Sequence, residues 1–212
     1  MLIQILVDNP NSWIIPYIKE LINTIKSKFG YSAVLLHDHD QVITGEILCL
    51  LSCEKIFKAL HLNKHNLVVH ESDLPKGKGW SPVTWQVLEG KKEIPVTLFE
   101  ASKKVDAGEI YFQKNIKLIG HELIDEIKDI QGAITNELII KFLENYPGIK
   151  GTPQIGEETF YKKRTPSDSE LDIEKSIKEQ FDLLRVCDNE RYPAFFVHNT
   201  RKYIIKIYND HE

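Results

Sequence analysis

The side chains of this sequence that could do chemistry begin with a histidine at the head of a loop. His70 closes the apolar run Asn66–Val69 and starts the stretch ESDLPKGKGWSP, which is rich in Gly, Pro and polar residues. The run predicts a strand and the stretch predicts a loop. Open α/β sheets bind their ligands at the carboxyl ends of strands. An imidazole can give and take a proton near neutral pH, but a histidine taken alone in such a place is more often a loop residue whose hydrogen bonds are satisfied locally.

The cysteines predict neither a disulfide framework nor a metal site. Three are present, Cys49, Cys53 and Cys187, and so few thiols in an odd number agree with a reducing compartment. Cys49 and Cys53 have the spacing C-x-x-x-C, and no second Cys or His pair at zinc-finger spacing follows. We therefore expect no metal.

The elements that must position His70 follow from the hydrophobic pattern. Short apolar runs alternate with segments of helical periodicity, which predicts an α/β fold with a mostly parallel sheet flanked by helices. The predicted strands are Leu2–Val7, Ala33–Leu36, Ile47–Leu51, Asn66–Val69, Ile94–Glu100 and Glu109–Gln113. The predicted helices are Trp13–Phe29, Lys55–Leu60, Val83–Glu89 and His121–Leu143.

The composition changes after Pro147. The stretch GIKGTPQIGEETFYKKRTPSDSELD has too few apolar residues for a core element and predicts a crossing loop. A helix over Ile173–Val186, capped by Asp172, and a hairpin of Ala194–Val197 with Lys202–Ile207 are expected to follow. We therefore predict a catalytic domain over residues 1–148 and a small C-terminal extension over residues 149–212.

Charge and hydropathy limit the partners. The formal net charge is −4 and the pI is about 6.1, which argues against wrapping a phosphate backbone, since that affinity comes from clustered Lys and Arg. No apolar run reaches the roughly 20 residues of a membrane helix, and the N-terminus does not have the pattern of a leader peptide. We expect a cytoplasmic protein with no nucleic-acid or membrane partner.

Two motifs resemble those of the folate-dependent formyltransferases. The stretch HESDLPKGKGWSP is similar to the signature loop N-x-H-P-S-L-L-P-x-x-R-G-x-x-P, and VDAGEI around Asp106 is similar to D-T-G-x-I. The separation of His70 and Asp106, 106 − 70 = 36 residues, is the usual spacing in that family. The matching loop positions are His70, Ser72, Leu74, Pro75, Gly79 and Pro82. The resemblance covers roughly residues 1–145 and implies the Rossmann-like formyltransferase fold.

The resemblance implies an N-formyltransferase that takes a formyl group from 10-formyltetrahydrofolate and gives it to an amine. His70 and Asp106 then hold the catalytic positions. The amine must lose a proton while the formyl carbon passes through a tetrahedral oxyanion. Asp106 is expected to accept a proton or order a water, and to favour the imidazolium form of His70, which can donate to the oxyanion. Which group takes the amine proton stays open.

One position departs from the family pattern. The catalytic Asn expected two residues before the histidine is here Val68, which cannot donate a hydrogen bond. Asn66 lies on the same face of a regular strand as His70, but about 13 Å away. Ser72, Glu71 or a backbone amide are the other candidates for the missing donor.

By the same resemblance, the segment Leu50–Ile56 falls where the family cradles the pterin. Leu51, Ser52 and Ile56, together with Asp106, are therefore candidate folate-binding residues. A buried strand end followed by a helix start explains the segment equally well.

The acceptor amine is expected to be on a nucleotide-linked deoxy-aminosugar. The loop VDNPNSW after the first predicted strand contains no glycine, unlike the phosphate loop of the ribonucleotide enzymes. An acidic chain of this length is expected to lack the basic C-terminal domain of the initiator-tRNA enzymes. The tail, with FYKKRTPSD at Phe160–Asp168 and LLRVCDNERYPAFF at Leu183–Phe196, is similar to that of sugar N-formyltransferases.

The diphosphate of a nucleotide needs cations, and its base needs an aromatic or apolar surface to pack on. The predicted substrate-binding residues are Ser72, Lys78, Gly79, Trp80, Arg164, Arg185 and Tyr192, with Arg191 and Trp13 as further candidates. The run from Lys162 to Arg164 is equally explained as solvated loop charge.

Within the sugar class, the resemblance favours a UDP-linked 4-amino-4,6-dideoxy hexose of the pseudaminic acid branch, in surface-glycan or nonulosonic acid biosynthesis, and is compatible with a homodimer. Two alternatives stay open. Loss of the motif Asn at Val68 would fit a degenerate relative that binds folate or a nucleotide sugar without turnover. A hydrolase that deformylates the folate would instead need water in the acceptor site.

Overall fold

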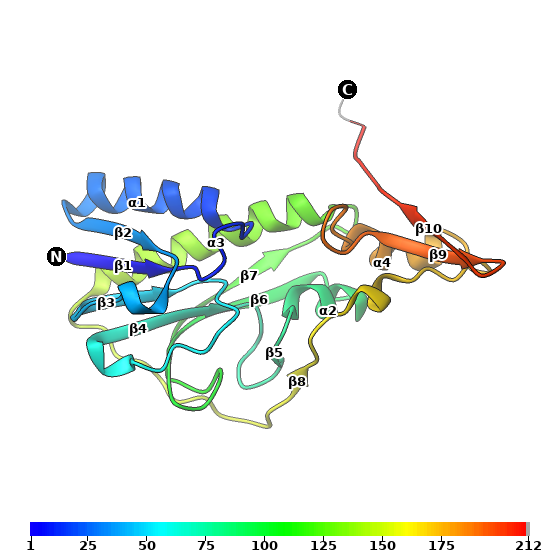
Figure 1. The fold of residues 1–212 in the computed structure, drawn as a ribbon. Helices are drawn as coiled ribbons and strands as arrows, with labels where there is room; N and C mark the ends of the chain where they lie inside the picture. Colours follow the sequence, from blue (N-terminus) through cyan, green and yellow to red (C-terminus); the bar gives the residue numbers. More distant parts are fainter. Residues whose placement is uncertain (211–212) are drawn as a thin grey trace.

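The computed structural model describes residues 1–210 and centres on a six-stranded sheet in the order β2-β1-β3-β4-β6-β7 (Figure 1). The first four strands of this order are parallel, and β6 and β7 run antiparallel at one edge. The strands are β1 (Leu2–Leu6), β2 (Ser32–Leu36), β3 (Gly45–Leu50), β4 (Asn63–His70), β6 (Glu93–Glu100) and β7 (Ile110–Lys117). The predicted mostly parallel sheet flanked by helices is confirmed.

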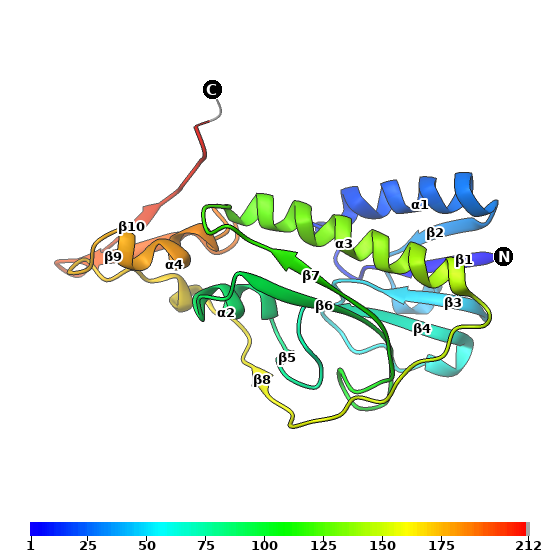
Figure 2. The ribbon, with the colours of Figure 1, turned by 180° about the vertical axis from the view of Figure 1, so that it is seen from behind.

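Two long helices, α1 (Ile15–Phe29) and α3 (Ile124–Asn145), cover one face of the sheet (Figures 1 and 2). Ile18, Leu21 and Ile25 of α1 recur at helical spacing and are buried against the strands. The helices also touch each other. Gly132 of α3 lies so close to Tyr17 that a Cβ atom there would be 2.3 Å from the tyrosine ring.

The opposite face carries a second, smaller apolar cluster under short segments. Its buried members are Leu6, Leu36, Val42, Leu48, Leu50 and Phe57, beneath the short 3₁₀ turns η1 (His39–Gln41) and η2 (Leu60–Leu62). The helix predicted over Lys55–Leu60 is wrong. The amides of Glu54 and Lys55 donate to the carboxylate of Asp8. Phe57 lies in an irregular loop, and its side chain is buried.

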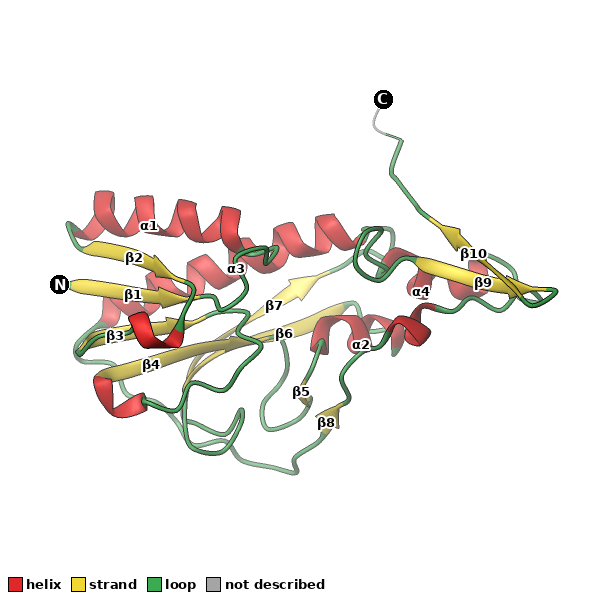
Figure 3. Ribbon diagram, in the orientation of Figure 1, coloured by secondary structure: helices red, strands yellow, loops and turns green. Residues whose placement is uncertain are grey.

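The rest of the chain forms a small unit beside the short helix α2 (Pro82–Leu88) (Figure 3). It contains the turns η3 (Pro166–Ser169) and η4 (Lys178–Gln180), helix α4 (Phe181–Arg185) and the hairpin β9 (Ala194–His198) and β10 (Arg201–Ile205). Before it, β8 (Phe160–Tyr161) pairs with β5 (Lys78–Gly79). The predicted hairpin is confirmed, and the domain boundary after residue 148 stays a prediction.

The helix predicted over Ile173–Val186 is confirmed only in its second half, where the 3₁₀ turn η4 leads into α4, and its first five residues are not helical. Ile173 and Ile177 are exposed, so this segment has no apolar face that packing could stabilise. Asp172 accepts a hydrogen bond from the amide of Glu174 in a local turn. Across residues 1–210, no helix has both the length and the apolar character needed to cross a bilayer.

Candidate active site

His70 is the last residue of β4 and lies on the sheet face opposite α1 and α3. Its imidazole is almost fully buried. The Nε2 atom lies 2.8 Å from the carbonyl oxygen of Gly77. Because a carbonyl can only accept, this contact requires that Nε2 carries the proton. The loop that follows β4 thus folds back and fixes the tautomer of His70.

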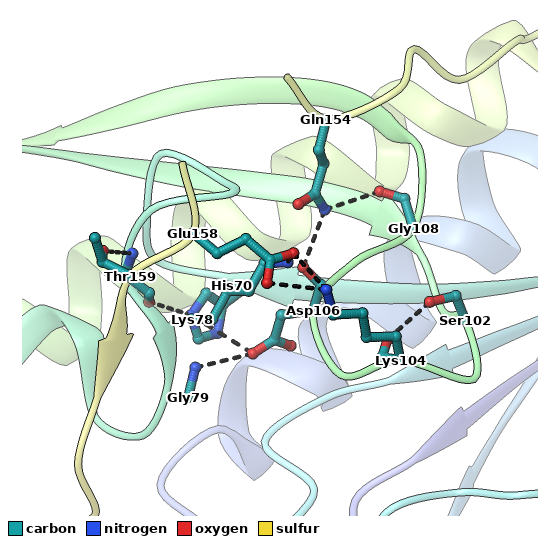
Figure 4. Close-up of polar contacts among 11 residues, drawn as sticks. His70, Lys78, Gly79, Ser102, Lys104, Asp106, Gly108, Gln154, Glu158 and Thr159 are labelled. Atoms are coloured by element: carbon teal, nitrogen blue, oxygen red, sulfur yellow. Dashed lines mark hydrogen bonds and ion pairs between the residues drawn. The ribbon is translucent and has the colours of Figure 1, made fainter. Parts of the chain in front are cut away.

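Asp106 reaches His70 from the loop between β6 and β7. Its carboxylate Oδ2 lies 4.0 Å from Nε2 of His70 and accepts a hydrogen bond of 3.0 Å from the amide of Gly79 (Figure 4). The two side chains are only 9% and 12% exposed, so their interaction is weakly screened. The structure therefore brings together the imidazole and the carboxylate that are 36 residues apart in the sequence.

Two glycines allow this close approach of loops. Gly79 has φ of 100°, and a Cβ atom on it would lie 2.5 Å from the carbonyl oxygen of Tyr161. A Cβ atom on Gly108 would lie 1.6 Å from the carbonyl oxygen of Glu100. Any side chain at either glycine would clash with the neighbouring carbonyl and push apart the loops that hold His70 and Asp106.

The candidates for the missing hydrogen-bond donor differ in their surroundings. Val68 packs with the smaller apolar cluster. The side-chain Nδ2 of Asn66 already donates to the carbonyl oxygens of Leu60, at 2.9 Å, and of Asn63. The carboxylate of Glu71 accepts a hydrogen bond from Gln131 of α3, and burial raises the pKa of this carboxyl. The hydroxyl of Ser72 is buried and has no hydrogen-bond partner among the described residues, so it is the uncommitted group.

The predicted folate-binding residues lie at the carboxyl end of β3. Leu51 is buried in the main core, and its amide donates to the carbonyl of Leu6; its role in folate binding stays a prediction. Ser52 has φ of 50° and its hydroxyl contacts that of Ser12 at 3.0 Å. Ile56 is 65% exposed and open to a ligand.

The predicted diphosphate cations are not open in this structure. Lys78 is fully buried and its Nζ lies 2.8 Å from Glu158. Arg164 is buried and donates to the hydroxyl of Ser169. Arg185 is buried in the same unit. These three side chains are held by internal partners, and their assignment to substrate binding stays a prediction.

Internal partners also hold Arg185, which donates to Asp182 at 2.7 Å and to the carbonyl of Glu122. The aromatic candidates divide. The ring of Tyr192 lies against the guanidinium of Arg164. Trp80, directly after Gly79, is 40% exposed, and Nζ of Lys163 lies 4.5 Å from the centre of its ring. Trp80 is thus a predicted substrate residue that is accessible and directly follows the loop that contacts His70 and Asp106.

Sequence reasoning missed a set of residues in the segment 152–161. Gln154, Glu158 and Thr159 contact the loops that hold His70 and Asp106. The segment has no periodicity, and the hydrogen-bond partners of its side chains are 42 to 82 residues away in the sequence. No local signal could have identified them.

Comparison with known proteins places this geometry in a family context. The model of the family described as "Formyl transferase" matches residues 34–141. A methionyl-tRNA formyltransferase of Enterococcus faecalis is 35% identical over 126 residues, which are 58% of this chain and 40% of that protein. The chain thus spans about two fifths of the length of this curated relative.

Solved structures share the fold over nearly the whole chain. The methionyl-tRNA formyltransferase from Clostridium thermocellum superposes with a TM-score of 0.78 at 21% identity, covering 95% of this chain and 90% of that one. A sugar N-formyltransferase from a Shewanella species superposes with a TM-score of 0.70 at 15% identity, covering 100% and 99%. At such identities the likeness establishes the fold.

Proposed function

The chain belongs to the formyl transferase family, and from this premise we propose that it transfers a formyl group to an amine with His70 and Asp106 as its catalytic residues. The formyl donor of the family is 10-formyltetrahydrofolate. The observation that carries the proposal is the buried pair itself, with Nε2 of His70 4.0 Å from Oδ2 of Asp106 at the carboxyl end of β4.

In the transfer, the amine nitrogen bonds to the formyl carbon while the bond from that carbon to the folate nitrogen breaks. The amine loses one proton and the folate nitrogen gains one. The carbonyl oxygen carries negative charge in between, and a preorganised N–H donor stabilises it. We assign this role to His70 as an imidazolium, which Asp106 stabilises across a poorly solvated gap.

The remaining contacts to the donor are proposed from position. Ser52 and Ile56, which follow β3, would contact the folate together with Asp106, and the buried Leu51 would shape the site from beneath. The hydroxyl of Ser72, which has no hydrogen-bond partner within residues 1–210, would replace part of what Val68 cannot supply.

For the acceptor, we propose an amino group on a nucleotide-linked deoxy-aminosugar. Trp80 offers an exposed ring beside the catalytic loop, with the cationic Lys163 over it. A ring and a cation suit a base and its phosphates. The net charge of −4 disfavours a large polyanion. The sugar N-formyltransferase from the Shewanella species shares the fold over the full chain.

The proposed sugar is a UDP-linked 4-amino-4,6-dideoxy hexose for surface-glycan or nonulosonic acid biosynthesis, acted on by a homodimer. A second candidate is methionyl-tRNA, because the Enterococcus relative at 35% identity acts on it. A third is binding of folate without turnover, which the loss of the motif Asn at Val68 motivates.

One experiment separates these candidates. The purified protein is incubated with 10-formyltetrahydrofolate and, separately, with UDP- and dTDP-linked 4-aminosugars and with methionyl-tRNA, and products are weighed by mass spectrometry. Gain of one formyl group on a UDP-sugar supports the proposal. Gain of a formyl group only on methionyl-tRNA would mean that the acceptor is the tRNA. If no acceptor of the panel gains a formyl group although the protein binds folate, binding without turnover is favoured.

A further inference from the structure

A single segment, residues 152–161, crosses both loops that carry the proposed catalytic pair, and we refer to it as the strap. At its start, Thr152 pairs with Ile110 of β7. The side-chain amide of Gln154 then donates to the carbonyl oxygens of Asp106, at 3.0 Å, and of Gly108, at 2.9 Å (Figure 4). The strap thus holds the backbone from Asp106 to Ile110, directly after the turn that presents the Asp106 side chain.

The end of the strap fixes the other loop. The hydroxyl of Thr159 accepts a hydrogen bond from the amide of Gly77, and its carbonyl accepts one from the amide of Lys78. The carbonyl of Gly77 is the partner of His70, and the amide of Gly79 is the partner of Asp106. The backbone from Gly77 to Gly79 therefore contacts both catalytic side chains and is held by the strap.

Glu158 joins the two loops through its carboxylate. Oε1 lies 2.8 Å from Nζ of Lys78 and 2.8 Å from Nζ of Lys104, and Oε2 lies 2.9 Å from Nζ of Lys104. Lys104 belongs to the loop of Asp106, and Lys78 lies between the two glycines of the other loop. These hydrogen bonds hold the pKa of Glu158 below its ordinary value.

The burial of Lys78 makes its ion pair with Glu158 important for keeping the strap in place. Its side chain is fully buried, and a buried ammonium group is strongly unfavourable without a partner. Glu158 is the carboxylate that meets it. Moving the strap away would strand this charge, so the ion pair ties the strap to the loop with a large penalty for opening.

We propose that Glu158 is a positioning residue, which holds His70 and Asp106 at their working distance by bridging Lys78 to Lys104. The proposal rests on the proposed function and adds a residue to it. Glu158 contacts neither reacting atom in this scheme. Its effect therefore falls on the geometry of the transition state, and the binding of either substrate is expected to change little.

The test compares Glu158→Gln with Glu190→Gln, a matched control that breaks the exposed pair between Glu190 and Lys206 in the C-terminal unit. For Glu158→Gln we expect kcat to fall roughly 10- to 100-fold, with KM for donor and acceptor within about twofold. Amide hydrogen exchange should accelerate in peptides covering residues 72–80 and 101–108. Glu190→Gln should change neither. An unchanged kcat and unchanged exchange in Glu158→Gln would overturn the proposal.

Because Glu158→Gln leaves the buried charge of Lys78 without a counter-charge, a second variant guards against loss of the fold. The double variant Lys78→Met/Glu158→Gln removes both charges and should melt near the wild type, since a buried ion pair is replaceable by apolar groups. Its kcat should stay low, because the link to Lys104 is gone. Recovery of wild-type kcat would overturn the proposal.

The outcomes separate this inference from the proposed function. If the wild type transfers no formyl group to any amine, the proposed function fails, and exchange in the two loops still decides whether Glu158 holds them. If the wild type is active and Glu158→Gln matches it in both readouts, the inference alone fails.

Discussion

Replacement of Asp106 by Asn isolates the electrostatic part of the proposed mechanism. The change removes one negative charge and keeps the size of the side chain, and the amide oxygen can still accept the hydrogen bond from Gly79. At 4.0 Å and an effective dielectric constant of roughly 20, a carboxylate attracts an imidazolium by about 4 kcal/mol. Both side chains are about nine-tenths buried, so solvent removes little of this attraction.

Only the part of this attraction that grows toward the transition state affects the rate. We therefore expect Asp106→Asn to lower kcat by roughly 100-fold, which corresponds to about 2.7 kcal/mol. The assay is the initial rate of formyl transfer at saturating donor and acceptor. The melting temperature and circular dichroism serve as controls for folding. A kcat within about threefold of the wild type, in a folded variant, would refute the electrostatic role of Asp106.

Three further predictions concern packing, ionisation and thiol reactivity. Gly132→Ala should destabilise the protein by about 1–2 kcal/mol, measured by urea unfolding, because the new methyl group would meet the ring of Tyr17 at 2.3 Å; an unchanged midpoint would contradict this packing. Burial raises the pKa of the Glu71 carboxyl, so the folded protein holds the carboxyl proton more tightly than the unfolded chain does. The free energy of unfolding therefore falls as pH rises from the unfolded pKa of this carboxyl toward its folded pKa. Glu71→Gln should therefore melt higher than the wild type at pH 7 and equally below about pH 4, and a constant difference in calorimetry at both pH values would argue against this assignment. Burial also raises the pKa of the Cys53 thiol to about 12, so iodoacetamide at pH 8 should leave it unmodified in the folded protein and alkylate it in urea; rapid alkylation of the folded form would count against that environment.

The sequence predicted most of the sheet and the two residues of the proposed catalytic pair. Apolar runs located the strands because buried strands need continuous apolar side chains. The Gly- and Pro-rich loop after His70 was predictable because it leaves the carboxyl end of a strand. Asp106 came from the resemblance, and the structure then placed it 4.0 Å from His70.

The missed features depend on contacts between distant parts of the chain. The segment Lys55–Leu60 has helix-compatible residues, but Asp8 takes the first amides and Phe57 is buried from a loop. The charge of Arg185 suggested a ligand, whereas its guanidinium is held by Asp182. A local sequence pattern shows neither which distant residue a side chain will contact nor whether tertiary packing will bury it.

The strap shows the same limit in the functional site. Glu158 lies 80 residues from Lys78 in the sequence, within a stretch of polar residues, glycine and proline that predicts only a loop. Pairing of β5 with β8 brings the two together. A two-residue parallel ladder leaves no hydrophobic pattern in the sequence.

The most direct test of the central claim is a comparison of formyl transfer by the wild type and by His70→Asn, with 10-formyltetrahydrofolate and the best acceptor of the panel. Product is followed by mass spectrometry. We predict steady gain of one formyl group with the wild type and a rate at least about 100-fold lower with the folded variant. Equal rates in the two proteins would contradict the assignment of His70, and with it the proposed chemistry of this site.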